Sequence, residues 1–493
     1  MVLDGSSDVD STIPTVSSPG LVAVNPATNR AYVAGSSGVT VIDGETNTTA
    51  TIATPPRPQA IAVNPMTNKI FVAHCNDSSC ATGAGSLSVI DGNNNSFVSI
   101  SVGIAPFAIG VNPVTNKVYV VNHNSNDVTV LDGTDNSTIT VPVGAEPYGV
   151  AINPATNKIY VTNQALSDHS VTVLDGKANS TSTITVDLAP SGIAVNPVTN
   201  KIFVVHPINT GGVLTIINGS NNSKTTVSIG NMPEGVAVNV TTNKVYVAYR
   251  GNQNDGGVSV IDGISSVVSN VPIGGQFSAL AVNESINKIY VTNRVANGTL
   301  AILEGVNNFV HSIGVGSFPS AVSVNPVTDK AYVANTSSST ATVITPATST
   351  PLPSNTDVVK FAGDSTKLAR PSFMFTAAAG GGPSAPAPNA IYFQVDSTYG
   401  TWVRAQNTTI VGNVLHASGT AAILAPGIHL IYFFATDGSD AASVNPIAPR
   451  KTRPAMRRVS EIPSASPLIG GINSYLFLVR SCRNGLNERQ KCR

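Results

Sequence analysis

The chain has 493 residues and a formal net charge of zero, with 27 basic and 27 acidic side chains. Charged residues make up only 11 % of it, against about 25 % in an ordinary soluble domain, which excludes a coiled coil or a long helical bundle. A hydrophobic content of 42 %, much of it Val and Ile, argues against a disordered chain. Abundant Val, Thr, Ser, Asn and Gly instead indicate a β-rich protein of extracellular type.

The charge is unevenly distributed along the chain. Residues 445–493 hold ten basic and two acidic side chains, a net charge of +8, so residues 1–444 carry −8. Because nucleic-acid binders usually have a strongly basic body, we expect no nucleic-acid partner. No secretory signal follows Met1, and no apolar run is long enough to span a bilayer, so we expect no transmembrane segment.

An internal repeat dominates the sequence between residues 10 and 346. The motif Asn-Pro-x-Thr-Asn-Lys-x-Tyr/Phe-Val recurs eight times, at intervals of 39 to 48 residues. Each copy is followed by Val-x-Val-Ile/Leu-Asp-Gly, and then by a run rich in Thr and Val that ends in Gly and a turn containing Pro. The first residues of the eight copies are Asn25, Asn64, Asn112, Asn153, Asn196, Asn239, Asn283 and Asn325.

Each repeat is typical of four short strands. In the fourth copy we expect strands near 149–152, 158–161, 171–174 and 182–186, with Asn-Pro-Ala-Thr-Asn and Asp-Gly forming turns. Four strands in about 40–45 residues is the period of a propeller blade. The sequence therefore predicts an all-β protein with a β-propeller of eight blades, seven being the alternative. Residues 11–16 look like the fourth strand that the last repeat lacks, so their pairing would close the ring.

These repeats resemble a known family. Residues 160–163 and 290–293 both read Tyr-Val-Thr-Asn, the signature of the YVTN-type β-propeller repeat, and all eight copies are similar to it. The resemblance covers residues 10–346 and implies a propeller of the bacterial or archaeal surface type. Proteins with such repeats serve as surface antigens, adhesion modules or envelope scaffolds, so the resemblance implies binding rather than catalysis.

The pattern changes after a linker at residues 347–355. Alternating apolar runs predict short strands at 372–377, 390–395, 401–405, 420–424, 429–435 and 474–479, which favours a β-sandwich over residues 356–480. The passage from Ile391 through His429 to Gly438 resembles immunoglobulin-like modules appended to bacterial surface proteins. The basic residues 481–493 show no core pattern, and we expect them to be disordered.

The cysteines form two local pairs, Cys75 with Cys80 and Cys482 with Cys492. Their spacing is poor for zinc without a second pair nearby. We expect both pairs to be disulfides in an oxidising compartment, with free thiols as the alternative. Together with the surface-type resemblance, this predicts a secreted, periplasmic or cell-surface protein.

Ligand sites on propellers usually lie on one rim, built from the loops between second and third strands and the loops that enter each first strand. Aromatic side chains there can stack on a sugar or a peptide, or pack against neighbouring loops. The candidate ligand-binding residues in these loops are His74, Phe107, Asn122, His123, Tyr148, Asn163, His206, Tyr249, Arg250, Asn293 and Arg294. The loops that enter the blades also offer Arg57, Gln59, Glu146, Ser191, Glu234, Gln276, Phe277 and Ser320.

Four of the seven His residues fall in this loop class. Because imidazole is a common metal ligand, His123, His169 and His206 are weak candidates for a metal site. His74 and His206, in the second and fifth blades, should lie too far apart for one ion, so we expect no metal and no other cofactor. At the position that His74 and His206 occupy, four other blades carry Asn. This indicates that the residue has a structural role, in which its side chain caps the end of the strand.

We therefore expect a binding scaffold whose rim holds a cell-surface polymer, a glycan or a protein ligand. The alternative is a propeller lactonase or hydrolase, or a metal-dependent enzyme, with its site at the His-bearing rim. Such an enzyme needs a His-centred base or converging carboxylates. The available carboxylates come from different blades without repeated geometry: Glu146, Asp168, Glu234 and Asp255.

Overall fold

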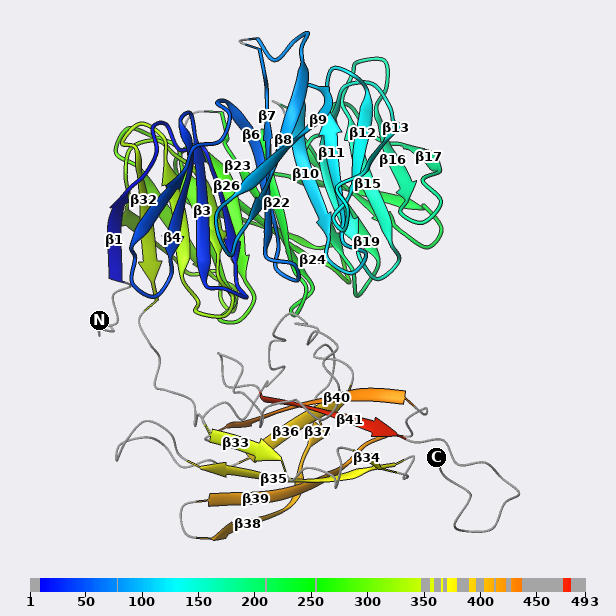
Figure 1. Cartoon of the computed structure of the whole chain (residues 1–493), viewed down its shortest axis with the longest axis vertical. Helices are drawn as coiled ribbons and strands as arrows, with labels where there is room; N and C mark the ends of the chain where they lie inside the picture. Colours follow the sequence, from blue (N-terminus) through cyan, green and yellow to red (C-terminus); the bar gives the residue numbers. More distant parts are fainter. Residues whose placement is uncertain are drawn as a thin grey trace. The chain divides into compact units, whose positions relative to one another are not determined.

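The computed structural model describes residues 9–346 except 78, 209–210 and 253–254, and, further on, residues 355–358, 365–366, 370–378, 390–395, 403–411, 414–422, 427–436 and 473–479. These residues form β-strands and turns, and they include no helix long and apolar enough to cross a membrane. The chain divides into two units (Figure 1): one is Asp8–Pro346, and the other contains the strands from residue 355 onward.

The first unit is a β-propeller of eight blades, each a four-stranded antiparallel sheet (Figure 1). From the innermost to the outermost strand, the blades are: blade 1, β2 Leu21–Asn25, β3 Arg30–Gly35, β4 Gly38–Asp43 and β5 Thr49–Ile52; blade 2, β6 Pro58–Asn64, β7 Lys69–His74, β8 Ala84–Asp91 and β9 Phe97–Ile104; blade 3, β10 Pro106–Asn112, β11 Lys117–Asn122, β12 Asp127–Asp132 and β13 Thr138–Pro142; blade 4, β14 Pro147–Asn153, β15 Lys158–Asn163, β16 Ser170–Asp175 and β17 Thr181–Thr185; blade 5, β18 Ile193–Asn196, β19 Lys201–His206, β20 Gly212–Asn218 and β21 Lys224–Ile229; blade 6, β22 Pro233–Asn239, β23 Lys244–Tyr249, β24 Gly257–Asp262 and β25 Val268–Pro272; blade 7, β26 Phe277–Asn283, β27 Lys288–Asn293, β28 Thr299–Glu304 and β29 Val310–Gly314; blade 8, β30 Pro319–Val324, β31 Ala331–Asn335, β32 Thr340–Thr345 and β1 Val9–Pro14.

The blades form a closed ring. Each innermost strand contacts the innermost strand of the next blade, and β2 of blade 1 contacts β30 of blade 8. The N-terminal strand β1 completes blade 8 by pairing antiparallel with β32, from Val9 opposite Thr345 to Pro14 opposite Thr340. The prediction of eight blades, with the first residues supplying the missing strand of the last repeat, is confirmed.

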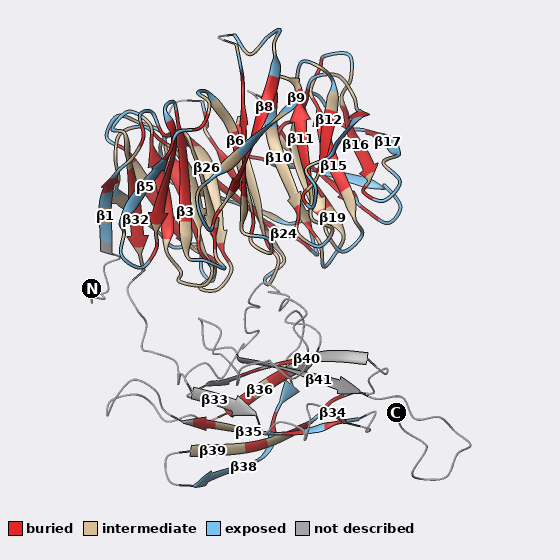
Figure 2. Cartoon of the chain, viewed as in Figure 1, coloured by how far each residue is buried: buried red, intermediate tan, exposed pale blue. Residues whose placement is uncertain are grey.

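Both faces of the middle strands are buried between neighbouring blades (Figure 2). In β15, Ile159 and Val161 pack with blade 3, whereas Tyr160 packs with Ile202 and Val204 of blade 5. The motif Tyr or Phe is fully buried in every blade. The repeat therefore alternates polar and apolar residues only in its outermost strands, where one face meets water (Figure 2).

A ring of asparagine side chains joins each blade to the next. The first Asn of each motif donates from Nδ2 to the Oδ1 of the fifth motif residue in the following blade, over 2.7–3.1 Å. That fifth residue has a positive φ of 50–59° in all eight copies, which Asn and Asp tolerate. The eight pairs are Asn25–Asn68, Asn64–Asn116, Asn112–Asn157, Asn153–Asn200, Asn196–Asn243, Asn239–Asn287, Asn283–Asp329 and Asn325–Asn29.

The Asp-Gly turn packs on the same asparagine. In blade 4, Gly176 donates its N–H to the carbonyl oxygen of Asn157 (2.9 Å), and a Cβ on this glycine would lie 2.4 Å from Asn157 Oδ1. Close approach therefore requires glycine here, while Asn179 supplies the positive φ of the turn (55°). Lys117 of blade 3 adds a second link between the blades, because its Nζ donates to the carbonyl oxygen of Gly176 (3.2 Å).

The second unit has two sheets that share one apolar core. Phe373, Phe375, Phe393 and Phe433 are at most 1 % exposed and lie at its centre. The sheets run in the orders β33-β35-β39-β38 and β34-β41-β40-β36-β37, formed by β33 Asn355–Val358, β34 Ser365–Thr366, β35 Ser372–Ala378, β36 Ala390–Val395, β37 Val403–Arg404, β38 Gln406–Val411, β39 Val414–Thr420, β40 Gly427–Thr436 and β41 Asn473–Val479.

One predicted strand of this unit is wrong. The strand expected at 420–424 ends instead at Thr420, because β39 begins at Val414. Its core-facing residues include Gly419, where a Cβ would lie 2.2 Å from the Phe393 ring. Because this core position carries glycine, the sequence there lacks the polar–apolar alternation that marks a strand. Residues 481–493, with Cys482 and Cys492, and most of the predicted linker lie outside the described residues.

The asparagine ring predicts an asymmetry between two isosteric substitutions. Asn153→Asp replaces a buried donor by an acceptor facing Asn200 Oδ1, and we expect it to lower the free energy of unfolding by about 2–3 kcal/mol. Asn200→Asp keeps an oxygen that accepts from Asn153, as Asp329 accepts in blade 8, and it should lower the free energy of unfolding clearly less. Denaturant unfolding followed by circular dichroism measures both. Equal losses would contradict the assigned donor and acceptor.

Candidate functional site

The last residue of each second strand points into its own blade and not towards the rim. His74, Asn122, Asn163 and His206 are fully buried, and Tyr249 is 7 % exposed. We expected these five side chains on the rim, and that placement is wrong. The reason is that neighbouring blades cover both faces of the second strand up to its end, so only residues beyond the strand reach the rim.

Hydrogen bonds to the third strand hold the buried Asn side chains. Asn163 Nδ2 donates to Ser170 Oγ (2.8 Å) and Thr172 Oγ1 (2.9 Å). Asn293 is bonded in the same way to Thr299 Oγ1 (3.1 Å). A glycine of the entering loop lies against this position, since a Cβ on Gly144 would be 2.5 Å from Asn163 Cγ. These contacts give the asparagines a structural role.

The two buried histidines are bonded inside the protein. His206 Nε2 lies 2.8 Å from Thr215 Oγ1, and its Nδ1 lies 2.9 Å from the carbonyl oxygen of Leu188. His74 Nε2 lies 3.1 Å from Ser88 Oγ. Burial lowers the pKa of His74 to about 4 and also lowers the pKa of His206. Neither ring can meet a ligand without opening its blade.

The weak metal candidates His123, His169 and His206 do not form a metal site, although His169 lies near His206. Within the part of the chain that the structure describes, no three His, Cys, Asp or Glu side chains are placed to hold a metal ion. His169 instead accepts at Nδ1 from the backbone N–H of Ala189 (3.4 Å). The geometry therefore gives the metal-dependent alternative no support.

The two arginine candidates lie on the other side of the ring, in blades 6 and 7. Arg250 forms an ion pair with Glu234 of the same blade, and both side chains are partly exposed. Arg294 follows β27 and is exposed. The pairing neutralises one arginine and one of the carboxylates that the hydrolase alternative requires.

Three aromatic rings do gather on the rim, from blades 3 and 4. The ring of Phe107 lies 4.4 Å from that of Tyr148 and 6.0 Å from that of His123, measured between centroids. The β10 pairing skips Phe107, and the β14 pairing skips Tyr148, so each lies in a bulge after a proline. Such a bulge re-aims the side chain, which explains why Phe107 is 38 % exposed.

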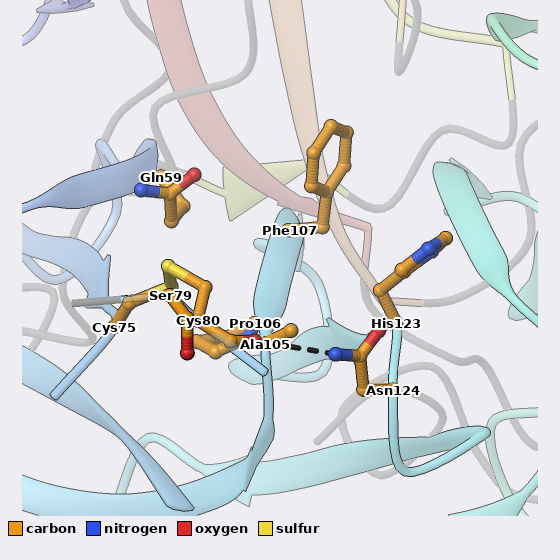
Figure 3. Close-up of a pocket in the computed structure, with 9 residues that line it drawn as sticks. All are labelled: Gln59, Cys75, Ser79, Cys80, Ala105, Pro106, Phe107, His123 and Asn124. Atoms are coloured by element: carbon orange, nitrogen blue, oxygen red, sulfur yellow. Dashed lines mark hydrogen bonds between the residues drawn. A yellow bond between two sulfur atoms is a disulfide. The ribbon is translucent and has the colours of Figure 1, made fainter. Parts of the chain in front are cut away.

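A pocket of about 220 Å³ lies beside Phe107 (Figure 3). Figure 3 shows Gln59 on one side, His123 and Asn124 on the other, and the Cys75–Cys80 disulfide with Ala105 and Pro106 between them. Ser79 completes the lining. The prediction that Cys75 and Cys80 form a disulfide is confirmed.

Hydrogen bonds fix the disulfide loop. Asp77 accepts from the backbone N–H groups of Ser79 (2.8 Å) and Gly83 (2.6 Å), and bonds from Ser79 and Gly83 hold the pKa of this carboxyl below its ordinary value. From blade 3, Asn124 Nδ2 donates to the carbonyl oxygens of Cys80 and Ala81 (both 3.3 Å). The pocket wall is therefore tied to both blades.

Sequence reasoning missed Asn124 and the role of this loop. A signal was present: the interval between the second and third motifs, 48 residues, is the longest of the seven, and this longer repeat contains both cysteines. An insertion in one repeat of a propeller maps to a loop and often to the binding face.

Comparisons with known proteins support the fold only. No family model matches the chain, and no curated protein matches it. Hydrazine synthase from Kuenenia stuttgartiensis superposes with a TM-score of 0.50 at 18 % identity, covering 59 % of this chain and 96 % of that one. Dihydro-heme d1 dehydrogenase NirN, in complex with DHE, gives 0.49 at 12 % identity, covering 61 % and 67 %. At 18 % identity, the first of these likenesses shows a shared β-propeller.

The buried histidines predict a pH effect. Because the pKa of His74 falls from 6.5 to about 4 on folding, the unfolded chain binds a proton that the folded protein does not, and stability decreases as the pH drops through this range. His74→Asn introduces the residue that blades 3, 4, 7 and 8 carry. We expect it to remove about 2–3 kcal/mol of the stability loss between pH 7 and 4.5, measured by denaturant unfolding. An unchanged pH dependence would contradict a buried neutral His74.

Proposed function

We propose that this protein is an extracytoplasmic propeller of the YVTN-repeat surface type, and that it binds a ligand on the rim of blades 2–4. One observation carries the proposal: Phe107, Tyr148 and His123 cluster at this rim beside a pocket whose wall is fixed by a disulfide. Two of the other candidate histidines, His74 and His206, are buried in their blades and cannot reach a ligand at this rim. The arrangement favours binding over catalysis.

Five residues before the first motif Asn, only blades 3 and 4 carry an aromatic side chain; the exposed ring of Phe318 in blade 8 lies at a different position. At the position of Phe107 and Tyr148, blades 1, 5 and 8 carry small residues, Gly20, Ser191 and Ser320. The blade architecture therefore needs no aromatic side chain there. Aromatic rings left partly in water, beside polar groups, are typical of recognition surfaces.

The disulfide supports a location outside the reducing cytoplasm. Bonds such as Cys75–Cys80 persist in oxidising compartments and are rare in cytosolic proteins. The low charge content and the C-terminal β unit, which we propose is an immunoglobulin-like module, fit a protein of the cell surface or the secreted fraction. We infer that the ligand is a polymer, glycan or protein of the cell envelope.

Sedimentation of the full-length protein with isolated cell envelopes of its source tests this role. We expect Phe107→Ala and Tyr148→Ala to weaken the apparent affinity at least tenfold, the loss typical of an aromatic side chain at the centre of an interface. Phe309→Ala is the matched control, because Phe309 is 61 % exposed next to the outermost strand of blade 7, away from this rim. Envelope binding that survives both rim substitutions would contradict the proposal.

A further inference from the structure

The pocket beside Phe107 presents an apolar ring and polar groups without charge. Its lining contains no Asp, Glu, Lys or Arg; its polar side chains are Gln59, Ser79, His123 and Asn124. A charged ligand would lose its hydration there without meeting an opposite charge. The lining therefore disfavours phosphate and carboxylate ligands.

The polar side chains of the lining offer mainly hydrogen-bond acceptors to a ligand. His123 Nδ1 lies 3.1 Å from the carbonyl oxygen of Pro147, which can only accept, so Nδ1 carries a proton and Nε2 is the ring nitrogen left for a ligand. Asn124 uses its Nδ2 on the disulfide loop. Gln59 donates from Nε2 to the carbonyl oxygen of Arg57 (3.3 Å). Asn124 thus uses its amide nitrogen on the protein, Gln59 keeps one N–H, and both keep their carbonyl oxygens.

These acceptors lie on two sides of the pocket. Figure 3 shows Gln59 on one side of the pocket lining and His123 and Asn124 on the other, with Phe107 between them. A ligand that satisfies them must donate hydrogen bonds in two directions. It must also offer a face of C–H groups to the Phe107 ring.

We propose that this pocket binds one neutral sugar residue of a glycan. Sugar hydroxyls supply several donors around one ring, and the axial C–H groups supply the apolar face. The volume, about 220 Å³, is below the roughly 300–1,000 Å³ of pockets for drug-sized ligands, which suits a single ring. This assignment rests on the proposed binding role of the rim and specifies its ligand.

Contacts within the protein preform the wall of the pocket. The Cys75–Cys80 disulfide closes one side, and the bonds from Asn124 of blade 3 tie that loop to the next blade. A preformed wall reduces the loss of conformational freedom on binding. This matters for a single sugar, whose contacts are few.

Saturation-transfer NMR on the full chain tests the assignment, with methyl β-D-glucopyranoside, methyl α-D-mannopyranoside, galactose and N-acetylglucosamine as neutral probes and glucuronate as the charged one. We expect at least one neutral sugar to show transfer to its ring C–H protons, and glucuronate to show little. Phe107→Ala and Gln59→Ala should each reduce the signal at least fivefold. Phe107→Tyr, which keeps the ring, and Phe309→Ala should retain it.

Three outcomes would overturn the sugar assignment: no transfer to any neutral probe, equal transfer to glucuronate, or transfer that persists in Phe107→Ala. If sugar binding is absent while envelope binding still depends on Phe107, the rim function stands and its ligand is not a sugar. If both are absent, the rim function falls as well. Circular dichroism of each variant confirms that a lost signal reflects the pocket and not an unfolded propeller.

Discussion

The propeller depends on an asparagine side chain that recurs in all eight blades, whose amide oxygen accepts one hydrogen bond while its nitrogen donates another. In blade 3, Asn112 Oδ1 accepts from the backbone N–H of Val114 (3.1 Å), and its Nδ2 donates to Asn157 of blade 4 (2.9 Å). A fully buried amide must satisfy both its oxygen and its nitrogen, and this geometry does so within one turn and one neighbour. Repetition around a closed ring sets the spacing of all eight blades at their inner turns.

Apolar packing and this polar ring contribute different things. Each buried Val, Ile or Tyr between blades contributes about 1.5–3 kcal/mol, whereas a hydrogen bond contributes about 0.5–1.5 kcal/mol net. Packing therefore supplies most of the stability, and the amides select the geometry in which the blades pack. Because both faces of every blade are committed in this way, only the rim loops are free to differ between blades, and the Cys75–Cys80 loop differs most.

The sequence predicts those features that a repeated residue type enforces. Asn and Gly at fixed spacing indicate the turns, the count of motifs gives the blades, and the unpaired first and last strands predict closure. It does not predict where His74 and Asn163 point, because that depends on how neighbouring blades cover a strand end. The sequence does not predict the pocket either, because the pocket requires a bulge at Phe107 and a contact between Asn124 and a loop of another blade.

The closing strand also sets an order of events during synthesis. β1 finds its partner only when β32 emerges, and the last amide link, from Asn325 to Asn29, joins residues 296 positions apart. Until then the growing array exposes the apolar outer faces of its first and last blades. A chain exported in an unfolded state would therefore complete its ring only after its last blade had crossed the membrane. From that moment neither end of the array exposes an apolar face to another chain.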